Sequence, residues 1–199
     1  MDDNNIGPDL NKLMYSQLSI MDDLISSDTS SEFYRKRAVD AIYQDQNYTK
    51  AMELINVGLK ITDKHTEPLL YELRFKLLLL LNRESDALKD MTRAVNLYTN
   101  KAPCDYQNIS EIYQDLFSHY YKKCQFDLAA NAIFNAIESA EKLDEQQSNF
   151  QLFLLYRSQA KLNVQIGNNK AALLDEEKSK HYEKLYRQSL KNDEFSLPF

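Results

Sequence analysis

Glycine and proline are scarce in this chain of 199 residues, which contains three glycines and four prolines. Tight turns depend on these residues, and an all-β fold needs many tight turns. The composition therefore argues against an all-β fold. Hydrophobic residues make up 43% of the chain and charged residues 27%, an ordinary balance for a globular protein.

Long apolar segments are also missing. The longest apolar run, Leu77–Leu81, has five residues, whereas a helix needs roughly 20 to cross a bilayer. The N-terminus carries aspartate where a signal peptide carries lysine or arginine, and no apolar stretch follows. Two cysteines, Cys104 and Cys124, suggest no disulfide framework. We therefore expect a cytoplasmic or nuclear protein that does not insert into membranes.

Motifs that would indicate catalysis or metal binding are not found. The three histidines and two cysteines form no metal-ligand spacing of a familiar kind. The three glycines form neither a phosphate loop nor a dinucleotide-binding motif, and no serine lies in a nucleophile elbow. We therefore predict no catalytic residue, no metal site, no cofactor and no enzymatic activity.

The net charge of −6 is unevenly spread along the chain. Residues 1–31 contain six aspartates and one lysine, a net charge of −5, which leaves 24 acidic and 23 basic residues in 32–199. A nearly neutral body does not attract phosphate backbones in general. The charge distribution therefore argues against nucleic-acid binding.

The acidic N-terminal segment contains a predicted helix. Residues 9–25 place apolar side chains at spacings of three and four, which predicts an amphipathic helix with one apolar stripe. The polar stretch 26–31 follows as a linker, and Thr29 with Glu32 fits a helix-capping pattern. Phosphorylation in this acidic setting is the alternative interpretation of the serine- and threonine-rich stretch.

From residue 32 onward, small residues recur in register. Four segments have a small residue near the start of a second helix: Ala51, Ala87, Ala129 and Ala172. Seven residues later, each has another: Gly58, Ala94, Ala136 and Ser179. Two helical turns separate the members of each pair, so both lie on one face and let a neighbouring helix approach closely. Between them, Ile55, Met91 and Ile133 are expected core residues, whereas the fourth segment has Glu176.

The turns between the expected helices are aligned in the same way. They read Gln46-Asn47-Tyr48, Asn82-Arg83-Glu84, Cys124-Gln125-Phe126 and Gly167-Asn168-Asn169. Glycine and asparagine suit a left-handed turn residue at the end of a helix. In the last three segments the first helix also has an aligned tyrosine, at Tyr71, Tyr113 and Tyr156.

Together these features resemble the tetratricopeptide repeat (TPR) family, whose unit is a helix–turn–helix of about 34 residues. The resemblance covers roughly residues 32–180. It implies an all-α fold of antiparallel helix pairs, stacked as a short TPR-like solenoid of about four repeats. A plain helical bundle is the alternative architecture.

The final stretch, residues 170–191, is long and charged, and we interpret it as a capping helix of the solenoid. Four of its residues are expected to cover the last pair: Leu174, Tyr182, Leu185 and Tyr186. Four others are expected to face water: Glu176, Glu177, Lys178 and Lys180. The predicted organisation is thus an acidic leader with an amphipathic helix (1–31), a helical repeat domain (32–191) and a short tail (192–199).

In the TPR family, ligand peptides lie on the concave face formed by the first helix of each pair. The resemblance therefore implies a partner-binding groove with residues from four first helices. We assign to it Lys36, Arg37, Asp40, Tyr43, Leu69, Leu73, Lys76, Leu80, Glu111, Asp115, Tyr121, Arg157 and Lys161. The expected function is a non-catalytic adaptor or complex subunit that binds a protein or peptide on this face.

The family's carboxylate clamp for chaperone C-termini is the best-defined mode of binding, and this sequence departs from it. Lys36 fits the clamp, but Asp40 and Leu73 replace its asparagines, and Glu111 and Asp115 replace its basic pair. Acidic groups would repel a terminal carboxylate. We therefore do not expect a chaperone tail as the ligand. An alternative function is a regulatory sensor or co-chaperone-type protein in which the helix at 9–25 gates the groove.

Overall fold

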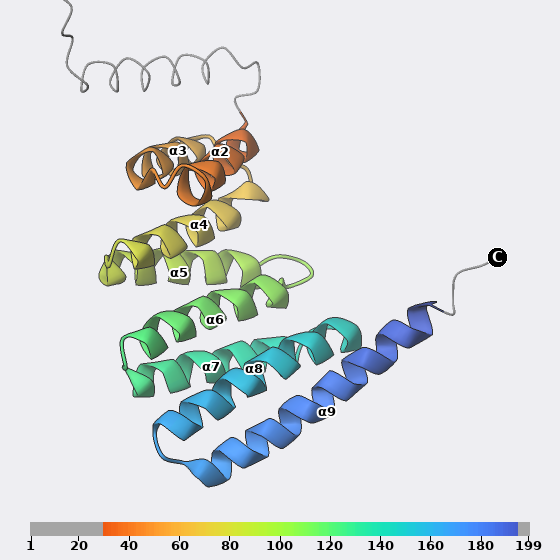
Figure 1. Cartoon of the computed structure of the whole chain (residues 1–199). Coiled ribbons are helices and arrows are strands. Elements are labelled where there is room, and N and C mark those ends of the chain that lie inside the picture. The colour runs from red at the N-terminus through yellow and green to blue at the C-terminus, as the bar shows by residue number, and fades with distance from the viewer. Residues whose placement is uncertain (1–29, 195–199) are drawn as a thin grey trace, which may run out of the picture. The chain divides into compact units, whose positions relative to one another are not determined.

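The computed structural model describes residues 30–194, with side chains described as far as residue 190. Within this part, every regular element is an α-helix (Figure 1). The helices are α2 (Ser31–Tyr43), α3 (Tyr48–Lys60), α4 (Thr66–Leu80), α5 (Glu84–Thr99), α6 (Tyr106–Lys122), α7 (Phe126–Ala140), α8 (Glu145–Gln165) and α9 (Asn169–Glu194). The all-α class is therefore confirmed for these residues. The predicted leader helix at 9–25 lies outside them.

The chain divides into two compact units, residues 1–66 and residues 67–199. In the described part, the first unit contains the pair α2–α3. The second contains α4, apart from its first residue, and the helices α5 to α9. Consecutive helices of the second unit pack as the pairs α6–α7 and α8–α9, and α7 also packs against α8.

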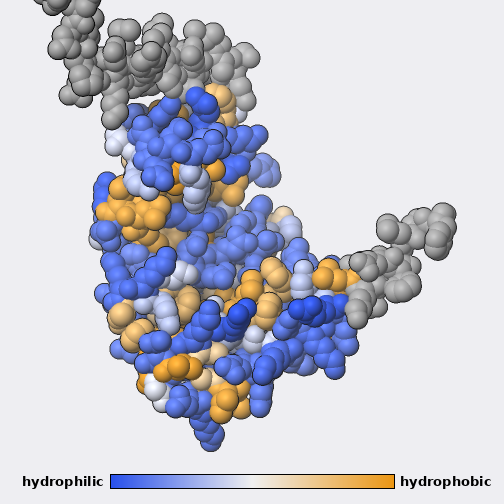
Figure 2. All heavy atoms as spheres, viewed as in Figure 1, coloured by the Kyte–Doolittle hydropathy of each residue, from blue (hydrophilic) through white to orange (hydrophobic). Residues whose placement is uncertain are grey.

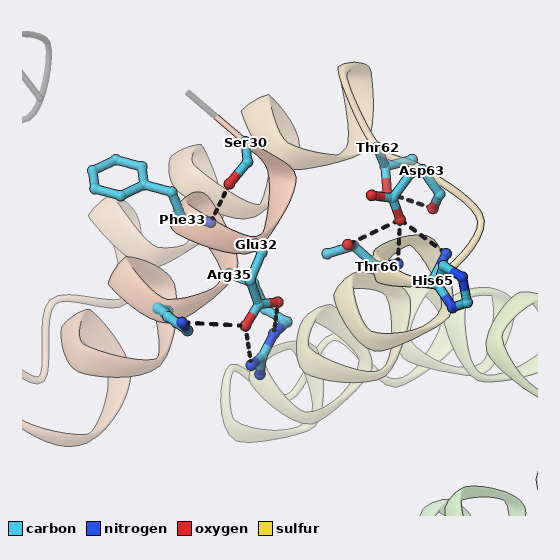
Figure 3. A network of polar contacts seen from close by, with 9 residues as sticks. Ser30, Glu32, Phe33, Arg35, Thr62, Asp63, His65 and Thr66 are labelled. Carbon is cyan, nitrogen blue, oxygen red and sulfur yellow. Dashed lines mark hydrogen bonds and ion pairs between the residues drawn. The ribbon is translucent and has the colours of Figure 1, made fainter. Parts of the chain in front are cut away.

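In the first unit, side-chain oxygens satisfy the free N–H groups at helix starts (Figure 3). The Ser30 hydroxyl accepts a hydrogen bond from the Phe33 N–H at 3.2 Å and caps α2. The Asp63 carboxylate accepts from the N–H groups of His65 and Thr66, at 2.9 and 2.8 Å, and from the Thr66 hydroxyl. The bonds from Thr66 and then His65 lower the pKa of Asp63 below its ordinary value.

The small residues that the sequence aligns are buried at the starts of the second helices. Ala51, Ala87 and Ala129 have no exposed surface, and Ala172 is 2% exposed. The four partners two turns later are buried as well, namely Gly58, Ala94, Ala136 and Ser179. The repeated pattern thus marks where helices approach one another, as predicted.

The four predicted turns each contain one residue in the left-handed conformation. Its φ is 51° at Gln46, 56° at Asn82 and Cys124, and 76° at Gly167. In the last three turns this residue donates its N–H to the carbonyl three residues earlier, and the next residue donates to the carbonyl five residues earlier. This is the Schellman arrangement, which satisfies the last carbonyls of a helix. The same local chemistry therefore ends α4, α6 and α8.

Because only glycine adopts this conformation without a Cβ clash, two substitutions should have opposite effects. No atom lies within 4 Å of a Cβ built at Gly167, so backbone strain alone should decide the effect there. We expect Gly167→Ala to lower the free energy of unfolding by about 1 kcal/mol. Cys124→Gly should raise it by about 0.5 kcal/mol, since glycine relieves strain but frees the unfolded chain. Urea unfolding measures both, and a stabilising Gly167→Ala would contradict the assignment.

The predicted capping helix corresponds to most of α9, the second helix of the last pair. As predicted, Glu176, Glu177, Lys178 and Lys180 are exposed. The prediction for Leu174 was wrong, because this side chain is 53% exposed and does not cover the pair. Ala172 and Asp175 take the buried positions on that turn, which turns Leu174 toward solvent. Figure 2 shows mostly hydrophilic side chains over the visible face of α9.

Candidate functional site

Four of the predicted groove residues lie on α2, in the first unit. Tyr43 is 64% exposed, and the Lys36 ammonium lies 3.9 Å from the Glu32 carboxylate with its side chain 69% exposed. Asp40 accepts a hydrogen bond from the Gln44 side chain at 3.1 Å, and Arg37 is half-buried. These residues are therefore surface groups of the first helix pair.

The predicted apolar strip on α4, in the second unit, is interrupted. Leu80 is 56% exposed and Leu69 is half-buried, but Leu73 is only 8% exposed. Leu73 falls on the same helical stripe as Leu70 and Leu77, which are completely buried. It therefore belongs to the core and is not available to a ligand.

Two other predicted residues, Lys76 and Asp115, belong to a polar network that joins α4, α5 and α6. The Lys76 ammonium lies 2.8 Å from the Glu72 carboxylate and 3.2 Å from that of Asp115. Glu72 is buried, and it also accepts a 2.8 Å hydrogen bond from the hydroxyl of the buried Tyr98. Glu111 lies beside this network on α6 and accepts a hydrogen bond from Gln107.

The pKa shifts in this network follow from partial burial and from the partners. Burial disfavours the charged form of Lys76, but Glu72 and Asp115 outweigh it and raise the Lys76 pKa. Burial also raises the Asp115 pKa, against the opposing effect of Lys76. The Tyr98 pKa is raised by burial and then by Glu72. Lys76 therefore bridges Glu72 on its own helix and Asp115 on α6, and in this way it links two first helices.

The remaining three predicted residues, Tyr121, Arg157 and Lys161, line one groove of about 530 Å³. The groove lies among the side chains of α6, α8 and α9, and we name it the α8–α9 groove. Its lining consists of Tyr121 from α6, Phe153, Arg157, Ala160, Lys161, Val164 and Gln165 from α8, and Glu176, Ser179, Lys180 and Glu183 from α9.

Helical periodicity explains why these residues gather. On α8 the lining residues recur every three or four positions from Phe153 to Val164, which places them on one face. Ala160 and Ser179 are 3% and 6% exposed, so the two helices approach closely at these small residues. The Ser179 hydroxyl also donates a 3.0 Å hydrogen bond to the Phe153 carbonyl, which ties α9 to the start of the groove wall.

The charged side chains that line the groove differ in whether they have a partner of opposite charge. Among residues 30–190, neither Arg157, Lys161 nor Lys180 forms an ion pair or hydrogen bond through its side chain, and all three are exposed. Glu183 is held by the Arg187 guanidinium at 2.7 and 3.0 Å. Glu176 is the one acidic lining residue that has no such partner within the same described range. The groove therefore presents an excess of positive charge.

The contribution of α9 to this groove was not predicted from the sequence. Lys180 and Glu176 were expected only to face water, which they do, but they also form the groove wall. The small residue at Ser179 was the available signal, because it marks the face of α9 that approaches α8. Lys180 is one position and Glu176 one turn away from Ser179, so both border the contact between α9 and α8.

Residues 30–194 thus form packed pairs of α-helices, with an open groove in the second unit whose lining contains more basic than acidic side chains. Comparison with protein-family models, curated proteins and solved structures found no match. In the described part of the chain, no helix combines the length and apolar character needed to span a bilayer. Residues 30–194 also contain no cluster of three or more histidine, cysteine or acidic side chains suited to a metal ion.

Proposed function

We propose that this protein is a non-catalytic interaction module of the TPR type that binds a polypeptide partner in the α8–α9 groove. The observation that carries the proposal is the lining of that groove. It combines exposed apolar surface at Val164, which is 53% exposed, with charged groups that lack partners within residues 30–190. Polypeptide-binding surfaces combine apolar contacts with polar groups that fix the register of the bound chain.

The proposed site is narrower than the groove that the sequence predicted. Lys76 and Asp115 are already paired with each other, and Leu73 is buried. Breaking the Lys76–Asp115 pair would leave the half-buried Asp115 carboxylate without this cation, which disfavours ligand contacts there. Tyr121, Arg157 and Lys161 have no such constraint and form the part of the predicted groove that we propose to bind the partner. A scaffold or adaptor role in the cytoplasm or nucleus is part of the same proposal.

Photo-crosslinking from the groove tests this function. A photoreactive phenylalanine analogue replaces Tyr121, which lines the groove, or Phe134, which is 62% exposed on α7 and lies outside the lining. We expect irradiation in the protein's own cells to give discrete protein adducts from position 121 and few from position 134. Equal adducts from both positions, or adducts from position 134 alone, would contradict the proposed site.

The same experiment addresses the regulatory alternative. Removal of residues 1–29, which carry most of the acidic excess, should leave the adducts from position 121 unchanged if the protein is a constitutive adaptor. A marked increase in those adducts would instead support gating of the groove by the leader.

A further inference from the structure

We propose that the α8–α9 groove selects acidic polypeptide segments, whose carboxylate side chains pair with the basic lining residues that have no partner within residues 30–190. This inference rests on the proposed function and adds the chemical class of the partner. Its basis is the contrast between the basic residues of α4 to α7 and those of α8 and α9.

Basic residues from α4 to α7 are almost all neutralised by carboxylates of the same unit. From Arg74 to Lys142, each of them except Lys122 forms an ion pair of 3.4 Å or less. The pattern changes at α8. In the described part of α8 and α9, Arg187 is the basic residue that pairs with a carboxylate, and the others do not. Four of the unpaired cations of α8 and α9, namely Arg157, Lys161, Lys180 and Lys184, line the groove or the hollow beside it, whereas Lys170 and Lys178 lie outside both linings.

These four unpaired cations form two rows. Arg157 and Lys161 are one turn apart on α8, and Lys180 and Lys184 are one turn apart on α9. Lys180 and Lys184 also line a second hollow that contains Glu183 and Arg187. Residues four apart on a helix are separated by about 6 Å along its axis, and side chains on one face of an extended peptide repeat at about 6.8 Å. An extended segment with acids at alternate positions therefore matches either row.

The apolar residues of the groove indicate which side chains the partner segment has between its acidic residues. Phe153 and Val164, which keep exposed surface, belong to the same face of α8 as the two basic residues. Apolar side chains of the partner can be buried against them, which contributes roughly 25 cal/mol per Å² of apolar surface. We therefore infer a segment in which acidic and apolar residues are mixed.

A nucleic acid fits this lining less well than an acidic peptide does. Its phosphates recur along the whole strand, and the carboxylates of Glu176 and Glu183 lie in the groove wall. Residues 32–199 contain 24 acidic and 23 basic residues, so they provide no general attraction for an extended polyanion. A short acidic segment places its charges only where the cations are.

Selection from a library tests the inference without a known partner. The full-length protein is presented with random 12-residue peptides displayed without a free C-terminus, so that enrichment reports side-chain carboxylates only. Selected peptides are then synthesised with amidated C-termini and titrated by fluorescence anisotropy. The test variant carries Arg157→Gln, Lys161→Gln and Lys180→Gln, and the matched control carries Lys60→Gln, Lys122→Gln and Lys170→Gln, which are exposed outside the lining.

We expect enrichment of aspartate and glutamate over the unselected library. The test variant should bind the selected peptides about tenfold more weakly, since three exposed ion pairs are lost. The control variant should bind them as the natural protein does, and added salt should weaken binding. Circular dichroism confirms that both variants remain helical.

Three outcomes would overturn the inference, and they differ in what they imply for the proposed function. Selected peptides without acidic enrichment that still block the adduct from position 121 would leave polypeptide binding intact. Acidic peptides that bind both variants equally would place their site elsewhere. Selection of no peptide, with tight binding of single-stranded RNA instead, would contradict both proposals.

Discussion

Replacing Asp90 by alanine is expected to lower the free energy of unfolding by about 3 kcal/mol. The Asp90 side chain is 10% exposed, and its two oxygens lie 2.6 and 2.8 Å from Nε and Nη2 of Arg74. This bidentate pair joins α4 to α5 and raises the Arg74 pKa, first through the hydrogen bonds. Without Asp90, the Arg74 guanidinium, whose side chain is 23% exposed, loses both of these charged hydrogen bonds.

Asp86 provides the control for this prediction on the same helix. Its side chain is 43% exposed and pairs with Arg83 and Lys89 at the surface. Surface pairs contribute little, so Asp86→Ala should cost less than about 1 kcal/mol. Urea unfolding of both variants gives the comparison. Equal losses would show that the Arg74–Asp90 pair does not hold α4 against α5.

A second large loss is expected from Ala129→Leu, one of the small residues that recur in register. Ala129 has no exposed surface at the start of α7, so a leucine would force neighbouring side chains or the backbone to move. We expect the free energy of unfolding to fall by about 2 to 3 kcal/mol. Thermal or urea unfolding monitored by circular dichroism measures the change.

The next residue, Ala130, is a matched control because the substitution is the same and the helix is the same. It is half-buried, so a leucine there can extend toward solvent. Its effect should stay below about 1 kcal/mol, with a slight gain from burial of the added methylenes. A larger loss at Ala130 than at Ala129 would contradict the repeat register.

The helices and their register could be predicted because they depend on local chemistry. Positions seven residues apart lie on one face of any α-helix, so the spacing of Ala87 and Ala94, and of Ala129 and Ala136, is enough to indicate a close helix contact. The left-handed conformation of a turn residue also depends on nearby residues. All four predicted turns contain a residue in this conformation, including Cys124. Patterns within one helix or turn do not indicate which neighbouring helix a first helix packs against.

The candidate site could be predicted only in part, because it depends on contacts between distant residues. The Arg74–Asp90 pair spans 16 positions and the Tyr98–Glu72 hydrogen bond spans 26, and no short-range pattern links them. Leu73 was predicted to line the groove, but it lies on the buried stripe of its helix. Arg157 and Lys161 were predicted from the resemblance, whereas Lys180 entered the site only through the packing of α9 on α8.

The methyl groups of valine report directly on whether the α8–α9 groove receives a polypeptide. The chain has four valines: Val39, Val57, Val95 and Val164. Val164 lines the groove, and the other three do not. Methyl NMR spectra of the full chain, recorded while the selected peptide is added, should show shifts at Val164 and little change at the others. Shifts confined to Val57 or Val95 at saturating peptide would show that the peptide binds outside the α8–α9 groove.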